Sequence, residues 1–291
     1  MDDFQQQINQ WSDWQGLQTN VMAFEPLIQQ IYASENEPFK TPEPMVDSVV
    51  ARFNVGSTQI AIFPPSEVAS RTRDYYQATR FGLTRMARLK LGAPQLRHAG
   101  FIFDKYQFYY VIVQPLQGIP LTEFCVTAQP LAKSTLGRQI GTILTQLNTE
   151  VPNFSHVETR PDDWAMFGND FVAERTAWLQ QRPVTTNQFV HGNLTGDNLI
   201  VTSGQLGLQR FSSARPAARQ TELVPLILQA FNNDADLLAG FKATYQTTDL
   251  ASDLLLGLLL RWDGPQQVQQ LISDQAVTLA RVQRVVEQVI Q

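Results

Sequence analysis

Strand-type and helix-type patterns occupy separate parts of this 291-residue chain, and that segregation most constrains its fold. The stretch 49–63 reads as two strands joined by a turn at Gly56, and 99–113 reads as a second hairpin with "DKYQ" as its turn. The apolar side chains of the first strand alternate: Val49, Ala51, Phe53 and Val55. Between the hairpins, Ser66 follows two prolines and is a suitable N-cap for a helix that ends near Leu91.

Helical periodicity dominates the chain after residue 116, whereas residues 3–35 show only a weak helical pattern. One helix has a single apolar face made by Leu136, Ile140, Ile143 and Leu147. A C-terminal helix shows the same kind of spacing at Leu279, Val282, Val286 and Val289. The stretch 114–121 is rich in Pro and Gly and separates the two patterns. We therefore expect an α+β chain with two lobes, 1–115 and 116–291.

The charge balance narrows the ligands that this chain can take. A net charge of −5 and a pI of about 5.2 argue against nucleic acid or an anionic membrane, because proteins that bind either present a basic face. Cys125 is the only cysteine in the sequence, so it has no partner for an internal disulfide, and a half-buried thiol is expected. The N-terminus is acidic, unlike a signal peptide, and Arg261 interrupts the longest apolar run. We expect a cytoplasmic protein whose partner is a small molecule, a nucleotide or another protein.

One polar loop, "FVHGNLTGDNLIV" at 189–201, is followed by the strand "QLGLQRF" across a turn at Ser203-Gly204. The loop resembles the H-G-D-L-x-x-x-N loop of the aminoglycoside phosphotransferase and choline kinase family, relatives of the protein kinases. The letters "QRFS" resemble the family's next strand end, I-D-F-G. "LKLGAPQLRHAG", "VIVQPLQGIPL" and "DLLAGFKATYQ" resemble further family segments in the same order. The resemblance implies a small N-lobe with an antiparallel sheet and a helix, and a larger, mainly helical C-lobe that contains 189–211.

The chain departs from this family at the residues that carry the chemistry. In the family, the loop Asp accepts the substrate's proton, the loop Asn and strand Asp hold Mg²⁺, and an N-lobe Lys steadied by a helix Glu grips the phosphates. This chain has Asn193 in place of the loop Asp, Arg210 in place of the strand Asp and Phe63 in place of the Lys. Asn198 matches the family, and the helix over 74–91 contains no Glu. A neutral amide accepts no proton near pH 7, and a guanidinium repels the cation that it should hold.

Three further positions bear on the site. The phosphate-covering turn, which the resemblance places between the first two strands, has only Gly56. Asp197 precedes Asn198 and could replace the lost metal ligand, although neighbouring side chains usually point apart. Trp164 lies shortly before the loop, where core packing and the lining of a ligand pocket are both open interpretations.

Two functions remain open, and a third interpretation treats the loop as an ordinary polar turn without kinase-like ancestry. The first function is that of a pseudokinase, a catalytically inactive protein that binds a ligand or a protein, with an anionic or phosphate group held at Arg210 without metal. No cofactor is then expected. The alternative is an active ATP-dependent phosphotransferase on a small-molecule hydroxyl, which would use Asn198 and Asp197 with ATP and Mg²⁺. The residues of the site in either case are Asn193, Asn198, Arg210, Asp197 and Phe63.

Overall fold

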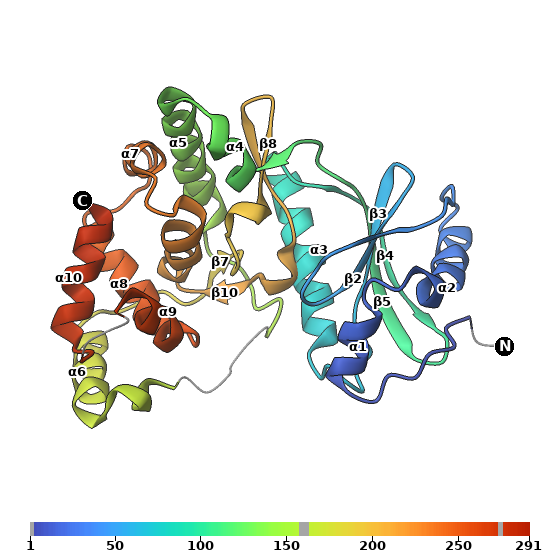
Figure 1. The fold of residues 1–291 in the computed structure, drawn as a ribbon, viewed down its shortest axis with the longest axis horizontal. Helices are drawn as coiled ribbons and strands as arrows, with labels where there is room; N and C mark the ends of the chain where they lie inside the picture. The colour runs from blue at the N-terminus through green and yellow to red at the C-terminus, as the bar shows by residue number, and fades with distance from the viewer. Residues whose placement is uncertain (1–2, 157–162, 273–275) are drawn as a thin grey trace. The chain divides into compact units, whose positions relative to one another are not determined.

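The computed structural model describes residues 3–156, 163–272 and 276–291 (Figure 1). The chain divides into two compact units. The first contains Met1–Gln117 and Leu208–Ala214, and the second contains Gly118–Gly207 and Arg215–Gln291. The sequence placed the boundary at 115/116 and the whole of 189–211 in the second part, whereas the segment from Leu208 to Ala214 packs with the first unit.

The first unit is built on a five-stranded sheet in which every pairing is antiparallel. Its strands follow the order β1-β2-β3-β5-β4. They are β1 (Glu43–Met45), β2 (Ala51–Val55), β3 (Thr58–Ile62), β4 (Gln95–Phe103) and β5 (Gln107–Gln114). Both predicted hairpins are confirmed as β2–β3 and β4–β5, and β1 is a strand that the sequence analysis did not predict.

Helices cover both faces of this sheet, as Figure 1 shows for α2 and α3. The helices are α1 (Trp11–Leu17), α2 (Val21–Ser34) and α3 (Thr72–Arg88). Trp14 of α1 and Phe24 of α2 share one apolar core with Ile60 and Ile112. Tyr76 of α3 instead packs on Tyr109, with ring centroids 4.8 Å apart. Because alternate strand residues face opposite sides of a sheet, α1 and α2 cover one face and α3 covers the other.

The predicted N-cap of α3 at Ser66 is wrong, since the helix begins at Thr72. The Pro65 carbonyl accepts bonds from Val68 and Ala69, which closes a separate turn before the helix. The Thr72 hydroxyl then donates to the Pro64 carbonyl at 2.5 Å and joins the helix start to that turn. The turn therefore occupies the backbone groups that a helix starting at Ser66 would need.

The second unit is mainly helical. Its helices are α4 (Leu121–Thr127), α5 (Pro130–Leu147), α6 (Asn169–Gln180), α7 (Ala235–Lys242), α8 (Leu250–Leu260), α9 (Gly264–Leu271) and α10 (Leu279–Ile290), together with a π-helical segment, Val224–Phe231. The predicted apolar face of α5 is buried, and so are Leu279, Val282 and Val286 of α10. A Cβ on Gly240 of α7 would lie 2.0 Å from the Ser134 carbonyl of α5, so glycine permits the close contact of these two helices.

Short strands hold the predicted loop in the second unit. β7 (Gln188–Val190) pairs with β10 (Arg215–Ala217), and β6 (Ile119–Pro120) pairs with β8 (Leu199–Thr202). β8 is also hydrogen-bonded to β9 (Gln205–Leu208), which confirms the predicted hairpin. Its turn residues Ser203 and Gly204 both have positive φ, 50° and 77°. The expected α+β class is confirmed, and none of the helices in the described ranges is long and apolar enough to cross a membrane.

Candidate functional site

A buried carboxylate, Glu222, holds the start of the loop that follows β7. Glu222 is fully buried and accepts the backbone N–H of His191 and the N–H of Gly192, the latter at 3.0 Å. Burial raises the pKa of Glu222 to about 7, and the two N–H groups with Arg215 and Arg261 limit that rise. The sequence analysis assigned no role to Glu222.

Within the loop, the two asparagines form a local bond. Asn193 is exposed, and its carbonyl accepts the Asn198 Nδ2 amide at 2.7 Å. Asn198 is 2% exposed, and its Oδ1 atom has no hydrogen-bond partner among the described residues. The Asn198 amide nitrogen therefore fixes the loop, while its oxygen remains an available acceptor.

The Asp197 side chain contacts a neighbouring helix of the second unit. The Asp197 side chain is exposed and its Oδ1 accepts the Thr122 hydroxyl of α4 at 2.9 Å. Asn198, the next residue, is buried. The Asp197 carboxylate is thus bonded to α4, and its role as a metal ligand beside Asn198 stays a prediction.

Arg210 lies at the end of β9 in the first unit and approaches Asp47. Its backbone is left-handed, with φ 63° and ψ 64°, and its Nε lies 4.0 Å from Asp47 Oδ2. Arg52 of β2 contacts the same oxygen at 3.1 Å. The other carboxylate oxygen accepts the N–H groups of Val49 and Val50 at 3.0 and 3.2 Å. One carboxylate is thus shared by two guanidinium groups and two backbone donors.

Two cationic side chains, Arg52 and Arg210, approach the Asp47 carboxylate. Burial by itself raises the pKa of Asp47, but Arg52, the two backbone donors and Arg210 outweigh it and hold this pKa below its ordinary value. Asp47 is therefore ionised near neutral pH, and it supplies one negative charge against the two positive charges of Arg52 and Arg210.

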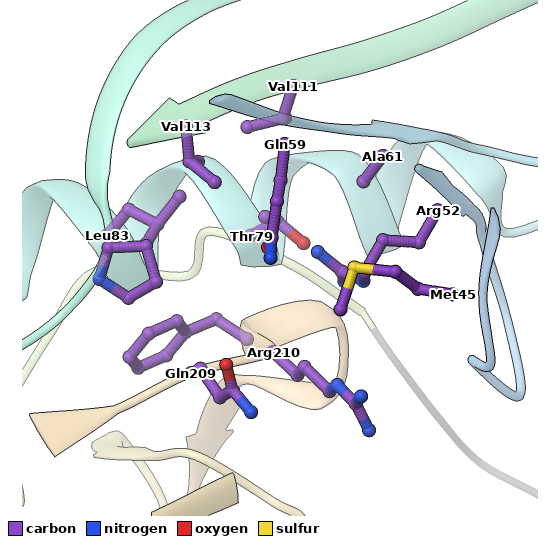
Figure 2. A pocket seen from close by; sticks show the side chains of 12 residues that line it. Met45, Arg52, Gln59, Ala61, Thr79, Leu83, Val111, Val113, Gln209 and Arg210 are labelled. Carbon is purple, nitrogen blue, oxygen red and sulfur yellow. The ribbon is translucent and has the colours of Figure 1, made fainter. Parts of the chain in front are cut away.

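A small pocket of about 30 Å³ opens beside these two arginines (Figure 2). Figure 2 shows Arg52, Gln59 and Ala61 reaching it from the sheet, and Gln209 and Arg210 from the end of β9. Its lining residues are Met45, Arg52, Gln59, Ala61, Thr79, Leu83, Pro94, Val111, Val113, Gln209, Arg210 and Phe211. These twelve include two arginines and no carboxylate, so the lining favours an anion over a divalent cation. No group of three or more potential metal ligands occurs in the ranges that the structure describes.

Phe63 is not among the residues that line this pocket. It is fully buried and packs edge-on against Tyr76, with ring centroids 5.9 Å apart. Thr79 of α3 does line the pocket. Its hydroxyl donates to the Tyr75 carbonyl at 2.9 Å. The aromatic at the expected Lys position thus packs in the core of the first unit.

Gly56 does not lie between the first two strands of the sheet, where the resemblance places the phosphate-covering turn. Gly56 joins β2 and β3, and because β1 precedes them, the first two strands of the sheet are joined by the loop 46–50. This loop contains no glycine and carries Asp47. The sequence around Asp47 gave only a weak indication of this turn. An Asp side chain can accept the backbone N–H groups of the residues two and three positions later, here Val49 and Val50.

Trp164 packs rather than lines a pocket in the described part of the second unit. It is 2% exposed and stacks on Phe171, with ring centroids 5.6 Å apart, and the Arg175 guanidinium lies 4.7 Å from the Trp164 ring centroid. Cys125 is half-buried, as predicted, and burial raises the pKa of its thiol.

The chain is similar to known proteins in structure and not in sequence. No protein-family model matches the chain, and no curated protein matches it in sequence. The GDP complex of aminoglycoside 2'-phosphotransferase-IIIa is similar in structure, with a TM-score of 0.60, 16% identity, and coverage of 93% of this chain and 98% of that one.

Two other solved structures show the same similarity. Amicoumacin kinase hAmiN in complex with AMP-PNP, Ca²⁺ and Ami has a TM-score of 0.58 at 12% identity, over 91% of this chain and 92% of that one. Choline kinase LicA from Streptococcus pneumoniae has a TM-score of 0.52 at 13% identity, over 90% and 97%. At such identities the similarity concerns the fold, which is the kinase-like fold of the aminoglycoside phosphotransferases and choline kinases.

Proposed function

We propose that this protein is a catalytically inactive relative of these phosphotransferases, a pseudokinase whose first unit binds an anionic group at Arg210 without a divalent cation. The observation that carries the proposal is the pocket beside Arg52 and Arg210, whose twelve lining residues include these two arginines and no carboxylate. Arginine is always charged and donates several hydrogen bonds, so it can neutralise a phosphate where other proteins of this fold use metal.

The loop of the second unit supports an inactive protein. Phosphoryl transfer depends on positioning and charge neutralisation, and general-base help contributes about 10²–10⁴-fold. Asn193 cannot accept a proton, and the Asp197 carboxylate is bonded to Thr122 instead. Without an acidic partner, one amide oxygen at Asn198 is a weak Mg²⁺ site.

An active phosphotransferase that uses ATP and Mg²⁺ on a small-molecule hydroxyl is the second candidate. One observation favours it: the buried Asn198 Oδ1 has no partner among the described residues, as expected of an atom that awaits a ligand. In this candidate, the Asp197 side chain would have to leave Thr122 and act as the carboxylate ligand of the Mg²⁺.

Thermal unfolding with ATP separates the two candidates, because a ligand that binds only the folded state raises the unfolding midpoint. We expect ATP to raise the midpoint equally in EDTA and in Mg²⁺, and Arg210→Ala to abolish the rise. Arg284→Ala, at an exposed position of α10, is the matched control and should leave it intact. A rise that requires Mg²⁺, together with phosphate transfer to a hydroxyl, would establish the second candidate and contradict the first.

A further inference from the structure

A cavity of about 270 Å³ lies within the second unit, and all the residues that line it belong to that unit. Its walls come from the π-helical segment Val224–Phe231, from α7 with the turn before it, and from the C-terminal end of α10. The pocket beside Arg52 and Arg210, in the first unit, measures only about 30 Å³. Because a cavity of about 150 Å³ is enough to hold benzene, this larger one has room for an organic ligand.

The inner walls of the cavity are apolar. Ile227 and Phe231 of the π-helical segment are each 2% exposed, and Leu238 of α7 is 8% exposed. Phe231 packs edge-on against Phe241, with ring centroids 5.6 Å apart, so its ring is held in place. Val289 continues the apolar lining from α10, but it is only half-buried, unlike the three earlier residues of the predicted apolar face of that helix. The cavity therefore leaves apolar surface in water, which an apolar ligand would cover.

Two charged side chains line the cavity, Asp234 and Lys242, and the first of them is already paired. Asp234 Oδ2 accepts the Lys133 ammonium at 2.7 Å, and its Oδ1 accepts the N–H groups of Asp236 and Leu237 at 3.1 and 3.0 Å. Burial by itself raises the pKa of Asp234, but Lys133 and these N–H groups outweigh it and hold this pKa below its ordinary value. The Asp234 charge is thus compensated inside the protein.

Lys242 supplies a cation at the open side of the cavity. It is exposed in the last turn of α7, and its ammonium donates to the Ile290 carbonyl, which is a neutral acceptor. An ammonium has three N–H donors, so Lys242 can keep this bond and also donate to a ligand. A ligand in the cavity would therefore meet apolar walls with its body and a positive charge with its outer end.

We propose that this cavity is a second ligand site, which takes a small carboxylate with an apolar body, such as a medium-chain fatty acid. The body lies against the apolar walls, and the carboxylate accepts hydrogen bonds from Lys242. An amine of the same shape is disfavoured, because its ammonium would meet that of Lys242 while Asp234 is paired with Lys133. The inference is independent of the proposed anion site at Arg210, which belongs to the first unit.

Isothermal titration calorimetry tests the site with three probes that share one apolar chain: octanoate, octanol and octylamine. We expect the wild type to bind octanoate, to bind octanol more weakly and not to bind octylamine. Lys242→Met keeps an apolar side chain but removes the charge, so octanoate should bind about tenfold more weakly and octanol as before. Lys242→Arg should retain octanoate. Lys90→Met, at an exposed position of the first unit, is the matched control and should bind like the wild type.

Ala239→Phe tests the location of the site. Ala239 lines the cavity and is itself exposed on α7, so a phenylalanine there occupies the cavity from its open side, and binding of octanoate and octanol should be lost. Binding that survives this substitution, or that Lys242→Met leaves unchanged, would show that the cavity and its lysine do not hold the ligand. Absence of octanoate binding to the wild type, or equal binding of octylamine, would equally overturn the proposal. Circular dichroism identifies a variant that misfolds, and the folded variants among the three then decide the outcome.

Discussion

At the scale of single residues, Phe211 shows how the chain keeps the architecture of its fold. The Phe211 ring is fully buried against Gly82, the one glycine of α3. A Cβ at Gly82 would lie 2.5 Å from the Phe211 ring, closer than real Cβ contacts come. Arg210, one residue earlier, has the left-handed backbone that aims it toward Asp47. A buried packing residue therefore lies beside an arginine at the position where the resemblance predicts an aspartate.

Gly82→Ala should destabilise the protein although alanine is the better helix former. Overpacking against Phe211 costs about 1–3 kcal/mol, and helix propensity returns at most about 1 kcal/mol. Gly16→Ala in α1 is the matched control, because nothing lies within 4 Å of its Cβ, and it should leave the protein equally or more stable. Urea unfolding measures both. Equal effects of the two substitutions would show that the Phe211 ring moves aside freely.

At the scale of elements, a charged cluster attaches the end of α2 to the edge of the sheet. The two ring nitrogens of His98 on β4 lie 2.8 Å from a Glu35 oxygen and 2.9 Å from a Glu37 oxygen. Arg97 contacts Glu37 at 3.2 Å, and the Tyr110 hydroxyl of β5 donates to Glu35. His98 therefore connects both carboxylates to β4 through its two ring nitrogens.

His98→Gln should weaken the attachment of α2 to the sheet. A glutamine side chain has one amide nitrogen, which cannot contact Glu35 and Glu37 in the way that the two separate ring nitrogens do. We expect a loss of about 0.5–1 kcal/mol, the scale of partly exposed ion pairs, and faster hydrogen exchange at the end of α2. His156→Gln, at an exposed histidine bonded to Asn153, is the matched control.

The hydrogen bond from His98, with help from Arg97, lowers the pKa of Glu37. This contribution is present above the ordinary Glu pKa and is lost as the pH falls through the lowered one, so the variant and the wild type should converge in acid. A difference that persists unchanged in acid would contradict the ion-pair explanation.

At the scale of the whole molecule, each unit has its own apolar core, and the second also buries charge at Glu222 and Arg261. Arg261 is paired with Asp263 at 2.6 Å and donates to the Thr221 carbonyl at 3.2 Å. Glu222 instead satisfies two backbone N–H groups of the loop. The Glu222 hydrogen bonds stabilise the loop, whereas burial of an ionised carboxylate in the core is unfavourable for folding.

Global stability should therefore fall as Glu222 ionises. Because its pKa is raised from 4.5 to about 7, the folded state holds this proton more tightly, and the favourable contribution is complete below pH 4.5 and lost as the pH rises through 7. The loss amounts to about 3 kcal/mol. Glu222→Gln imitates the protonated form, so its stability relative to the wild type should increase by that amount between pH 4.5 and 8. Urea unfolding at several pH values measures the difference, with exposed Glu174→Gln as the control. A difference that does not change with pH would mean that the Glu222 pKa is not raised.

Local patterns made much of the fold predictable. The alternation in 49–55 and the helical spacing of Leu136 to Leu147 arise from neighbouring residues, and both elements were predicted correctly. The kinase-like resemblance followed from packing residues such as His191 and Phe211, which are buried. The substitutions at Asn193 and Arg210 could also be identified directly, since they are changes of residue type.

What needed the tertiary structure are the features that depend on distant partners. The three-residue strand β1 is too short to show a period, and its pairing with β2 moved the loop between the first two strands to 46–50. Arg210 contacts the Val46 carbonyl of that loop although the two residues are 164 positions apart in the sequence, so no local pattern predicts this contact. Phe63 was expected at a ligand site, but the direction of its side chain was set by packing against Tyr76. The charge of each residue could be inferred from its letter, whereas the counter-charge that it meets depends on how the whole chain folds.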